Sequence, residues 1–276
     1  PIALMALVVG AALGLGGAQM QTLLDNPLAS PFTLGIAAAA GFGAALALVM
    51  SSYLGLHSIF SIPVGAFLFS MLAASLLFGL ALMRNVSSQT IILAGIALLF
   101  LFQSLLSLLQ FVSSPELNQQ IVFWLFGSLM RTTWQTLTIT TVVTLVCAIL
   151  LYRDAWKLTC LRLGEARARS LGVNINRLRI KTLVLVALMT ATAISFVGII
   201  GFVGLVAPHI GRMLIGEDQR FLIPLSALCG AAILSVSSVI SKSIVPGALF
   251  PIGIVTAIIG VPFFIWLILG RGRQHA

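Results

Sequence analysis

Residues 89–112 read QTIILAGIALLFLFQSLLSLLQFV and contain no charged side chain. A helix needs about 20 apolar residues to cross the roughly 30 Å of hydrocarbon in a bilayer, so this stretch predicts a membrane span. The rest of the chain has the same character, because 60% of its 276 residues are hydrophobic and only 8% are charged. This balance excludes a soluble globular domain, a disordered chain and a disulfide-linked scaffold, and it predicts an all-α polytopic membrane protein.

Eight further apolar segments lie on either side of residues 89–112. One of them, 203–215, is short, and an additional apolar segment at 121–130 is too short to cross, which predicts a re-entrant or interfacial helix. We expect a single transmembrane domain over residues 1–276. Its nine predicted spans are 2–24, 33–53, 58–83, 89–112, 134–152, 180–200, 203–215, 221–244 and 253–270.

The basic residues predict the orientation of these spans. Residues 153–181 hold eight Lys or Arg side chains, and cytoplasmic loops retain such residues. With this segment in the cytoplasm, alternation of the spans places thirteen of the fifteen basic residues on that side and leaves only Arg131 and Lys242 outside. The C-terminus is then cytoplasmic. Residue 1 falls on the outer side, and one preceding helix would return the N-terminus to the cytoplasm and give ten helices.

Small residues and prolines inside the spans predict how the helices pack. Gly10 and Gly14 are four residues apart, as in helices whose backbones approach closely in lipid. Pro208 lies within the short 203–215 segment, where we expect it to kink or break the helix. Broken helices at membrane depth are tolerated only against protein or a water-filled cavity, which favours a transporter or channel.

Several kinds of chemistry are missing from the sequence. It has no GxxxxGK[ST] phosphate-binding loop, no HExxH and no paired-cysteine motif, so we expect no cofactor or metal on this chain. Cys147, Cys160 and Cys229 are far apart and are expected to be free thiols. No acidic residue lies at the centre of a span, which disfavours an ion-coupled pump, so another subunit would supply energy for uphill transport. The net charge of +9 reflects loop topology, and we expect no nucleic-acid partner.

A polar segment between two spans, residues 161–176, reads LRLGEARARSLGVNIN. Its alanines, leucines and placed glycines predict two short helices broken at Gly172 rather than a disordered polar tract. An apolar face on these helices would fit the groove of a partner protein. The alternative is an ordinary basic loop. The residues of the predicted face are Leu163, Ala166, Leu171 and Val173.

Five stretches together resemble the FecCD-type permease subunits of ABC importers for iron-siderophores, haem and vitamin B12. The most specific are GFVGLVAPHIGRML at 201–214 and FPIGIVTAIIGVPFFIWLIL at 250–269. The resemblance covers essentially the whole chain and implies the type II ten-helix permease fold, with its first helix missing from this sequence. The other stretches are GAALGLGGAQMQTLLDNPLASPFTLGI at 10–36, ILAGIAL at 92–98 and LRLGEARARSLGV at 161–173.

The resemblance also implies partners. A second permease copy or a paralogue would complete a dimer around a central pathway. A periplasmic binding protein would deliver the cargo and dock near Lys242, and the 121–130 helix would lie near that mouth. Two ATP-binding subunits would carry ATP and Mg²⁺ and dock on coupling helices within 161–176. The implied coupling residues are Gly164, Glu165, Ala166, Arg169, Leu171 and Gly172. The implied cytoplasmic gate comprises Asn26, Pro27, Leu28, Ser88 and Gln89.

By this resemblance, the expected function is ATP-driven import of an iron-siderophore or related metal chelate by alternating access across a bacterial inner membrane. Import of haem or vitamin B12 is the alternative within the family, and an ion-coupled secondary transporter is the alternative from another class. The chain itself is not expected to be an enzyme. The side chains that either line the pathway or form interhelical hydrogen bonds are Gln19, Met20, Gln21, Gln103 and Gln110.

Overall fold

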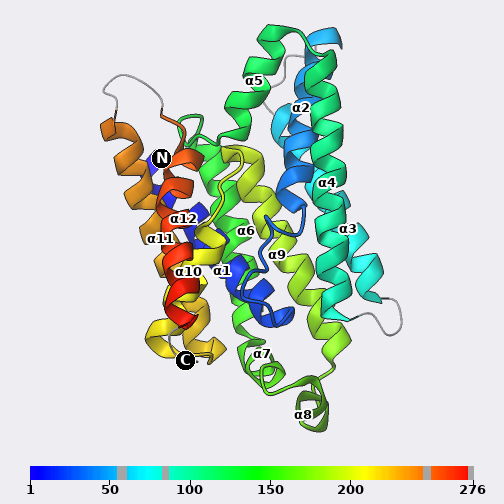
Figure 1. Cartoon of the computed structure of the whole chain (residues 1–276), viewed down its shortest axis with the longest axis vertical. Coiled ribbons are helices and arrows are strands. Elements are labelled where there is room, and N and C mark those ends of the chain that lie inside the picture. Colours follow the sequence, from blue (N-terminus) through cyan, green and yellow to red (C-terminus); the bar gives the residue numbers. More distant parts are fainter. Residues whose placement is uncertain (55–60, 83–86, 245–249, 273–276) are drawn as a thin grey trace.

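The computed structural model describes residues 1–54, 61–82, 87–244 and 250–272. This part of the chain consists of helices and the turns and loops that join them (Figure 1). The helices are α1 (Ile2–Leu23), α2 (Ile36–Leu54), α3 (Ser61–Leu82), α4 (Ser88–Val112), α5 (Pro115–Leu125), α6 (Trp134–Tyr152), α7 (Ala155–Leu161), α8 (Glu165–Ser170), α9 (Ile175–Val197), α10 (Val203–Ile215), α11 (Gln219–Ile244) and α12 (Ile252–Gly272).

Each of the nine predicted spans corresponds to one of these helices. Among the described residues, seven helices are long and apolar enough to cross a membrane: α1, α2, α3, α4, α6, α9 and α11. The 19 residues of α6 reach about 28 Å at 1.5 Å per residue, which matches the thickness of the hydrocarbon layer. The 13 residues of α10 reach only about 20 Å, so this helix is too short to cross on its own.

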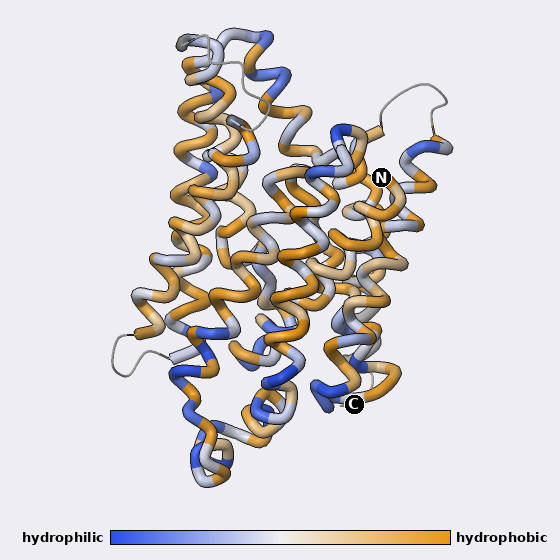
Figure 2. Tube along the Cα trace, turned by 180° about the vertical axis from the view of Figure 1, so that it is seen from behind, coloured by the Kyte–Doolittle hydropathy of each residue, from blue (hydrophilic) through white to orange (hydrophobic). Residues whose placement is uncertain are grey.

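The two ends of the bundle carry different elements. The helix pair α7–α8 and the end of α12 lie at one end, and α5 and the N-terminus lie toward the other (Figure 1). We call these the α8 end and the α5 end. Hydrophobic residues fill the middle of the bundle, whereas hydrophilic residues gather at its tips (Figure 2). Trp134 and Tyr152, at the two ends of α6, are 65% and 53% exposed, as is typical of aromatic side chains at membrane interfaces. Two basic residues that contributed to the predicted orientation, Arg84 and Arg273, lie outside the described residues.

The centre of the bundle is built on close backbone contacts of α1, which packs against α9, α10 and α11. A Cβ atom at Gly10 would lie 2.3 Å from the carbonyl oxygen of Gly230, and one at Gly14 would lie 2.3 Å from that of Ser226. The predicted close approach at Gly10 and Gly14 is therefore confirmed, with α11 as the partner helix. Helices in lipid associate through such packing because no hydrophobic force acts between them.

The short helix near the α5 end differs from the prediction. It covers Pro115–Leu125 instead of residues 121–130. Its start follows from local chemistry, because the side chain of Ser114 accepts a hydrogen bond from the backbone of Leu117 (3.4 Å) and proline fits the first helical position. Beyond α5 the chain turns away at Gly127, which has a φ of +71°.

The polar segment at the α8 end also differs in its boundaries. α9 begins at Ile175 rather than at residue 180, because the side chain of Asn174 caps it by accepting from the backbone N–H of Arg177 (3.0 Å). The two short helices are α7 and α8, and they meet at residues 162–164. The break predicted at Gly172 is present, but it separates α8 from α9.

Candidate functional site: the α7–α8 helix pair and the loop after α1

The helices α7 and α8 form a pair at the α8 end and differ in burial. α7 packs against α1 and α11, and its Leu158 and Cys160 are fully enclosed. α8 packs against α7 and α9 through Ala168, its single buried residue. Left-handed glycines flank α8, with φ of +101° at Gly164 and +80° at Gly172, and any side chain at these two positions would strain the backbone.

Three apolar side chains on or beside α8 are uncovered. Leu163 and Leu171 are 55% and 58% exposed, and Ala166 is also exposed. Val173, predicted on the same face, is buried instead, because the chain turns back there and the N–H of Val173 donates to the carbonyl of Ala168 (3.0 Å). Three of the four predicted residues, Leu163, Ala166 and Leu171, are therefore exposed, and we call them the exposed apolar triplet.

Glu165, the first residue of α8, attaches that helix to α9. Its carboxylate accepts hydrogen bonds from Arg179 of α9 (2.9 Å) and from Arg169 (3.0 Å). Arg179 is only 6% exposed, so its pair with Glu165 is less screened by solvent than an ordinary surface ion pair. Of the predicted coupling residues, Glu165 and Arg169 are thus engaged within the chain, while Ala166 and Leu171 face outward.

A second ion-pair cluster attaches α7 to α9. Asp154 is buried just before α7 and pairs with Lys157 (2.7 Å) and with Lys181 of α9. Burial alone would raise the pKa of Asp154, but hydrogen bonds from the two ammonium groups hold that pKa below its ordinary value. The carboxylate therefore stays charged at neutral pH. With the Glu165 pair, it holds the helix pair to α9 at two separate points.

A chain of hydrogen bonds leads from α7 into the bundle through Gln219, the first residue of α11. The backbone N–H of Gln219 donates to Thr159 Oγ1 of α7 (3.0 Å). Its side-chain Nε2 donates to Thr22 Oγ1 (3.0 Å), and its Oε1 accepts from Gln19 Nε2 (3.3 Å), both on α1. Gln19 and Gln219 are fully buried, so no solvent competes for these bonds.

Gln21 of α1 supplies a hydrogen bond that Pro208 removes from α10. Pro208 has no N–H to donate to the carbonyl of Gly204, four residues earlier. The Nε2 of Gln21 donates to that carbonyl instead (3.5 Å), and the Oε1 of Gln21 accepts from Arg212 of α10. Sequence reasoning expected Pro208 to kink or break the helix. α10 is not broken and runs from Val203 to Ile215, because Gln21 of α1 donates a hydrogen bond to the carbonyl that Pro208 leaves without a partner.

The five candidates for the pathway fall into two groups. Gln19, Met20 and Gln21 are buried inside the single chain, and the two glutamines form the interhelical hydrogen bonds described above. Gln103 and Gln110 lie on α4, where Gln103 is exposed and Gln110 is half-buried. Of the five, the α4 pair reaches the surface of the chain.

The loop after α1 is compact. Asn26 Oδ1 accepts from the backbone of Leu28 (2.8 Å), and the carbonyl of Leu28 accepts from Thr33 Oγ1 (3.1 Å). The end of this loop packs on α4, where a Cβ atom at Gly95 would lie 2.6 Å from Leu34 Cδ2. The loop is therefore braced by its own side chains and by α4.

The remaining predicted gate residues are accessible. Pro27 is exposed, as Leu28 is. Ser88 and Gln89 form the first turn of α4, and Gln89 is exposed. This turn lies about 10 Å along the helix axis from Gly95, on which the loop after α1 packs. Ser88 and Gln89 thus belong to α4, and the loop after α1 reaches the same helix through Leu34 at its far end.

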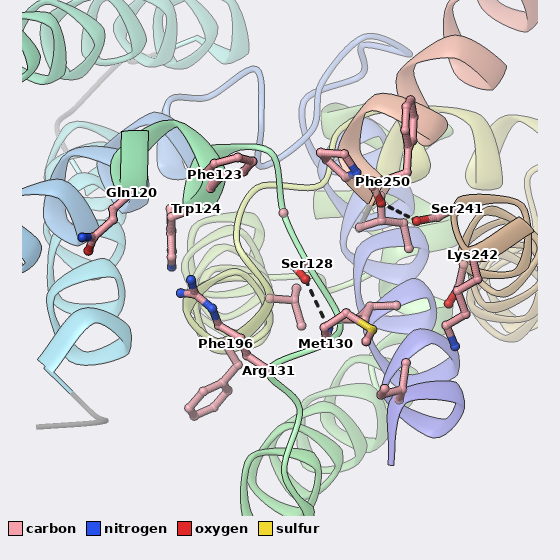
Figure 3. A pocket seen from close by; sticks show the side chains of 17 residues that line it. Gln120, Phe123, Trp124, Ser128, Met130, Arg131, Phe196, Ser241, Lys242 and Phe250 are labelled. Carbon is pink, nitrogen blue, oxygen red and sulfur yellow. Dashed lines mark hydrogen bonds between the residues drawn. The ribbon is translucent and has the colours of Figure 1, made fainter. Parts of the chain in front are cut away.

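A cavity of about 730 Å³ lies near the α5 end, between the loop after α5, the end of α9, the end of α11 and the start of α12 (Figure 3). Two basic side chains line it, Lys242 from α11 and Arg131 from the loop after α5. Sequence reasoning nominated Lys242 but not Arg131. The sequence could have identified Arg131 as well, because Arg131 and Lys242 are the two basic residues that the predicted orientation leaves outside. The aromatic and sulfur-containing lining residues are Phe123, Trp124, Met130, Phe196 and Phe250.

These features define a class of protein. A bundle with seven membrane-spanning helices among the described residues, and with a short helix pair at one end, is the fold of a polytopic membrane protein. The chain belongs to the FecCD transport family, whose model matches residues 1–270. It is the permease subunit of an ABC importer, and the ATPase sites lie on separate subunits. Family membership implies ATPase subunits and a binding protein as partners.

Individual relatives match over nearly the full chain. The hemin transport system permease HmuU of Yersinia pestis is 37% identical over 277 residues, which cover all of this chain and 83% of the relative. The vitamin B12 import permease BtuC of Vibrio vulnificus is 34% identical over all of this chain and 82% of the relative. A solved metal-chelate type ABC transporter in an inward-facing conformation superposes with a TM-score of 0.90 at 35% identity, over 98% of this chain and 85% of that one. The sequence-based recognition of the family and of the type II fold is confirmed.

Proposed function

We propose that this permease imports an iron-siderophore or a related metal chelate from the periplasm to the cytoplasm by alternating access. The exposed apolar triplet carries the proposal for the mechanism. Leu163 and Leu171 lie in a basic, polar segment, where they contact water unless a partner protein covers them. Apolar side chains clustered on a projecting, anchored element are typical of a protein interface, and a short helix fits a partner's groove.

Two ATPase subunits would dock on this surface, one on each permease copy. Their ATP and Mg²⁺ stay on those subunits, and this chain performs no covalent chemistry. Closure of the ATPases would move α8, and the Glu165–Arg179 pair would carry that movement to α9. The residues proposed for the contact are Gly164, Glu165, Ala166, Arg169, Leu171 and Gly172.

A second permease copy, identical or paralogous, would complete the pathway. Support comes from α4, which exposes Gln103, Ser104 and Ser107 within a membrane-spanning helix. Lipid offers such groups no hydrogen-bond partners, whereas a pathway between two copies would hydrate them. Gln110 lies on the same helix, and Ser88 and Gln89 at its start would join residues 26–28 in the cytoplasmic gate.

The cavity at the α5 end favours an anionic or oxygen-rich cargo delivered by a binding protein. Arg131 and Lys242 place positive charge at its rim, and aromatic side chains form much of its wall. These cations would meet acidic side chains of a periplasmic binding protein or the carboxylates of a chelate. Haem has the same chemical character and is the alternative cargo. Vitamin B12 is the third candidate in this family, and the cationic rim favours it least.

Proteoliposomes that hold the permease, its ATPase subunits and its binding protein are expected to accumulate the iron chelate only when ATP is hydrolysed. A variant of the ATPase subunits that binds but does not hydrolyse ATP is the control. Uptake of radiolabelled iron-siderophore, haem and cobalamin, measured side by side, identifies the cargo. Transport driven by an ion gradient without any ATPase would contradict the proposal and favour a secondary transporter.

The proposed orientation places the α8 end in the cytoplasm of a bacterium. In a background with the three native cysteines replaced by alanine, Ser170→Cys is expected to react with a membrane-impermeant maleimide only when the inner face is accessible. Gln119→Cys, on α5, is expected to react from the outside. Both positions are exposed in the single chain. Labelling of intact spheroplasts and of inverted vesicles tests this, and the reverse pattern would overturn the orientation.

A further inference from the structure

Arg162 lies where α7 ends and joins two elements that are distant in sequence. Its guanidinium pairs with Asp25, directly after α1, and with Glu217, in the turn between α10 and α11. The contact with Glu217 is one hydrogen bond, from Nη2 to Oε1 at 3.0 Å, and the charged Nε lies 3.0 Å from Oε2 without forming a hydrogen bond. A planar, forked cation is suited to holding two carboxylates in a fixed geometry.

Asp25 has an unusual backbone conformation for a residue with a side chain. Its φ is +47°, and it follows a helix end at which the N–H of Asn26 donates to the carbonyl of Gln21 (3.1 Å). This is the position at which helices most often place glycine. An aspartate there is strained relative to glycine, and what it contributes is the carboxylate that meets Arg162.

The contacts around Arg162 join three elements into one unit. Besides the Arg162 pairs, α7 receives the Gln219–Thr159 hydrogen bond, and Gln219 in turn donates to Thr22 of α1. Ion pairs and hydrogen bonds therefore connect three elements, namely the end of α1, α7 and the turn before α11. Asn26 and the rest of the predicted gate loop begin at the next residue after Asp25.

We propose that Arg162 is a positioning residue that passes movement of the coupling helices to the gate loop at Asn26–Leu28. This rests on the proposed function, in which ATPase subunits move α8 and α7. Displacement of α7 carries Arg162, and Arg162 carries Asp25 together with the α10–α11 turn. The gate loop and the coupling helices then move as one body rather than as independent parts.

Arg162→Gln is the first test, because it keeps a polar side chain but removes both ion pairs. The ATPase subunits should still bind and hydrolyse ATP, while the cargo transported per ATP falls by about tenfold. Arg153→Gln is the matched control, an exposed arginine at the same end for which the described residues offer no ion pair. Arg162→Lys keeps a cation beside both carboxylates and should retain much of the coupling. Unchanged transport per ATP in Arg162→Gln would overturn the proposal.

Cross-linking supplies a test that does not depend on the stability of Arg162→Gln. Asp25→Cys and Arg162→Cys, in a background with the native cysteines replaced by alanine, are joined by a short bismaleimide. Transport should persist after cross-linking, because the two positions move together. If cross-linking blocks transport, the contact must open during the cycle and the proposal is wrong. Failure of the proposed function is distinguishable, because the wild-type complex would then lack ATP-driven transport.

Discussion

Gly17→Ala is expected to prevent accumulation of folded permease, although it adds only one methyl group. A Cβ atom at this position would lie 1.8 Å from the carbonyl oxygen of Gly204 and 2.6 Å from its carbonyl carbon. Both atoms belong to helix backbone, so no side chain can rotate away. Relief requires α1 and α10 to separate, which disrupts contacts across the centre of the bundle at a cost of several kcal/mol, a large share of the ~5–15 kcal/mol that stabilises a typical fold.

The matched control is Gly79→Ala on α3, where a Cβ atom would have no neighbour within 4 Å. That change removes the roughly 1 kcal/mol penalty of glycine in a helix and should leave folding intact or slightly improved. Detergent-solubilised yield, monodispersity on size exclusion and thermal unfolding are the measurements. A Gly17→Ala protein with the wild-type melting temperature would show that α1 and α10 do not meet as described.

Leu171→Asp is expected to abolish capture of the ATPase subunits while the permease still folds. Leu171 is 58% exposed, so the substitution disturbs little packing within the chain. At an interface it would replace a buried apolar side chain with a charge that must lose its water. The lost burial and the desolvation together weaken binding by roughly a hundredfold or more. Co-purification with tagged ATPase subunits and binding-protein-stimulated ATP hydrolysis measure the effect.

Two variants separate docking from general effects of charge or shape. Asn176→Asp adds the same charge on an exposed site in the first turn of α9 and should leave capture unchanged. Leu171→Met keeps the apolar contact and should also bind. Gly172→Asp is less informative, because its φ of +80° makes any side chain strained. Capture by Leu171→Asp at the wild-type level would remove the exposed apolar triplet from the docking surface.

The helices were predictable because their signals are local. Length and hydropathy identified a helix for each of the nine predicted spans, and the density of basic residues located the polar segment at the α8 end. The errors lie where capping decides the boundary. Ser114 and Pro115 determine where α5 begins, and Asn174 determines where α9 begins. The predicted boundaries followed the apolar residues alone and therefore missed these capping residues.

The tertiary roles of single residues were not predictable in the same way. The sequence left open whether Gln19 and Gln21 face a pathway or other helices, because a glutamine in an apolar span is compatible with both positions. The Arg162–Asp25 pair joins residues 137 positions apart, and no periodicity connects them. Val173 was placed on the wrong side because the chain reverses after α8, which depends on the left-handed conformation of Gly172.

Proline in α10 has a mechanical consequence for the whole central region. The carbonyl of Gly204 is bonded by an amide that belongs to another helix, so sliding or rotating α10 against α1 would strand an acceptor inside the protein. Gln21 also accepts a hydrogen bond from Arg212, and the same movement would break that bond as well. Tilting the α1–α10 pair as a unit would keep both bonds, so such a movement costs less than a change of register between the two helices.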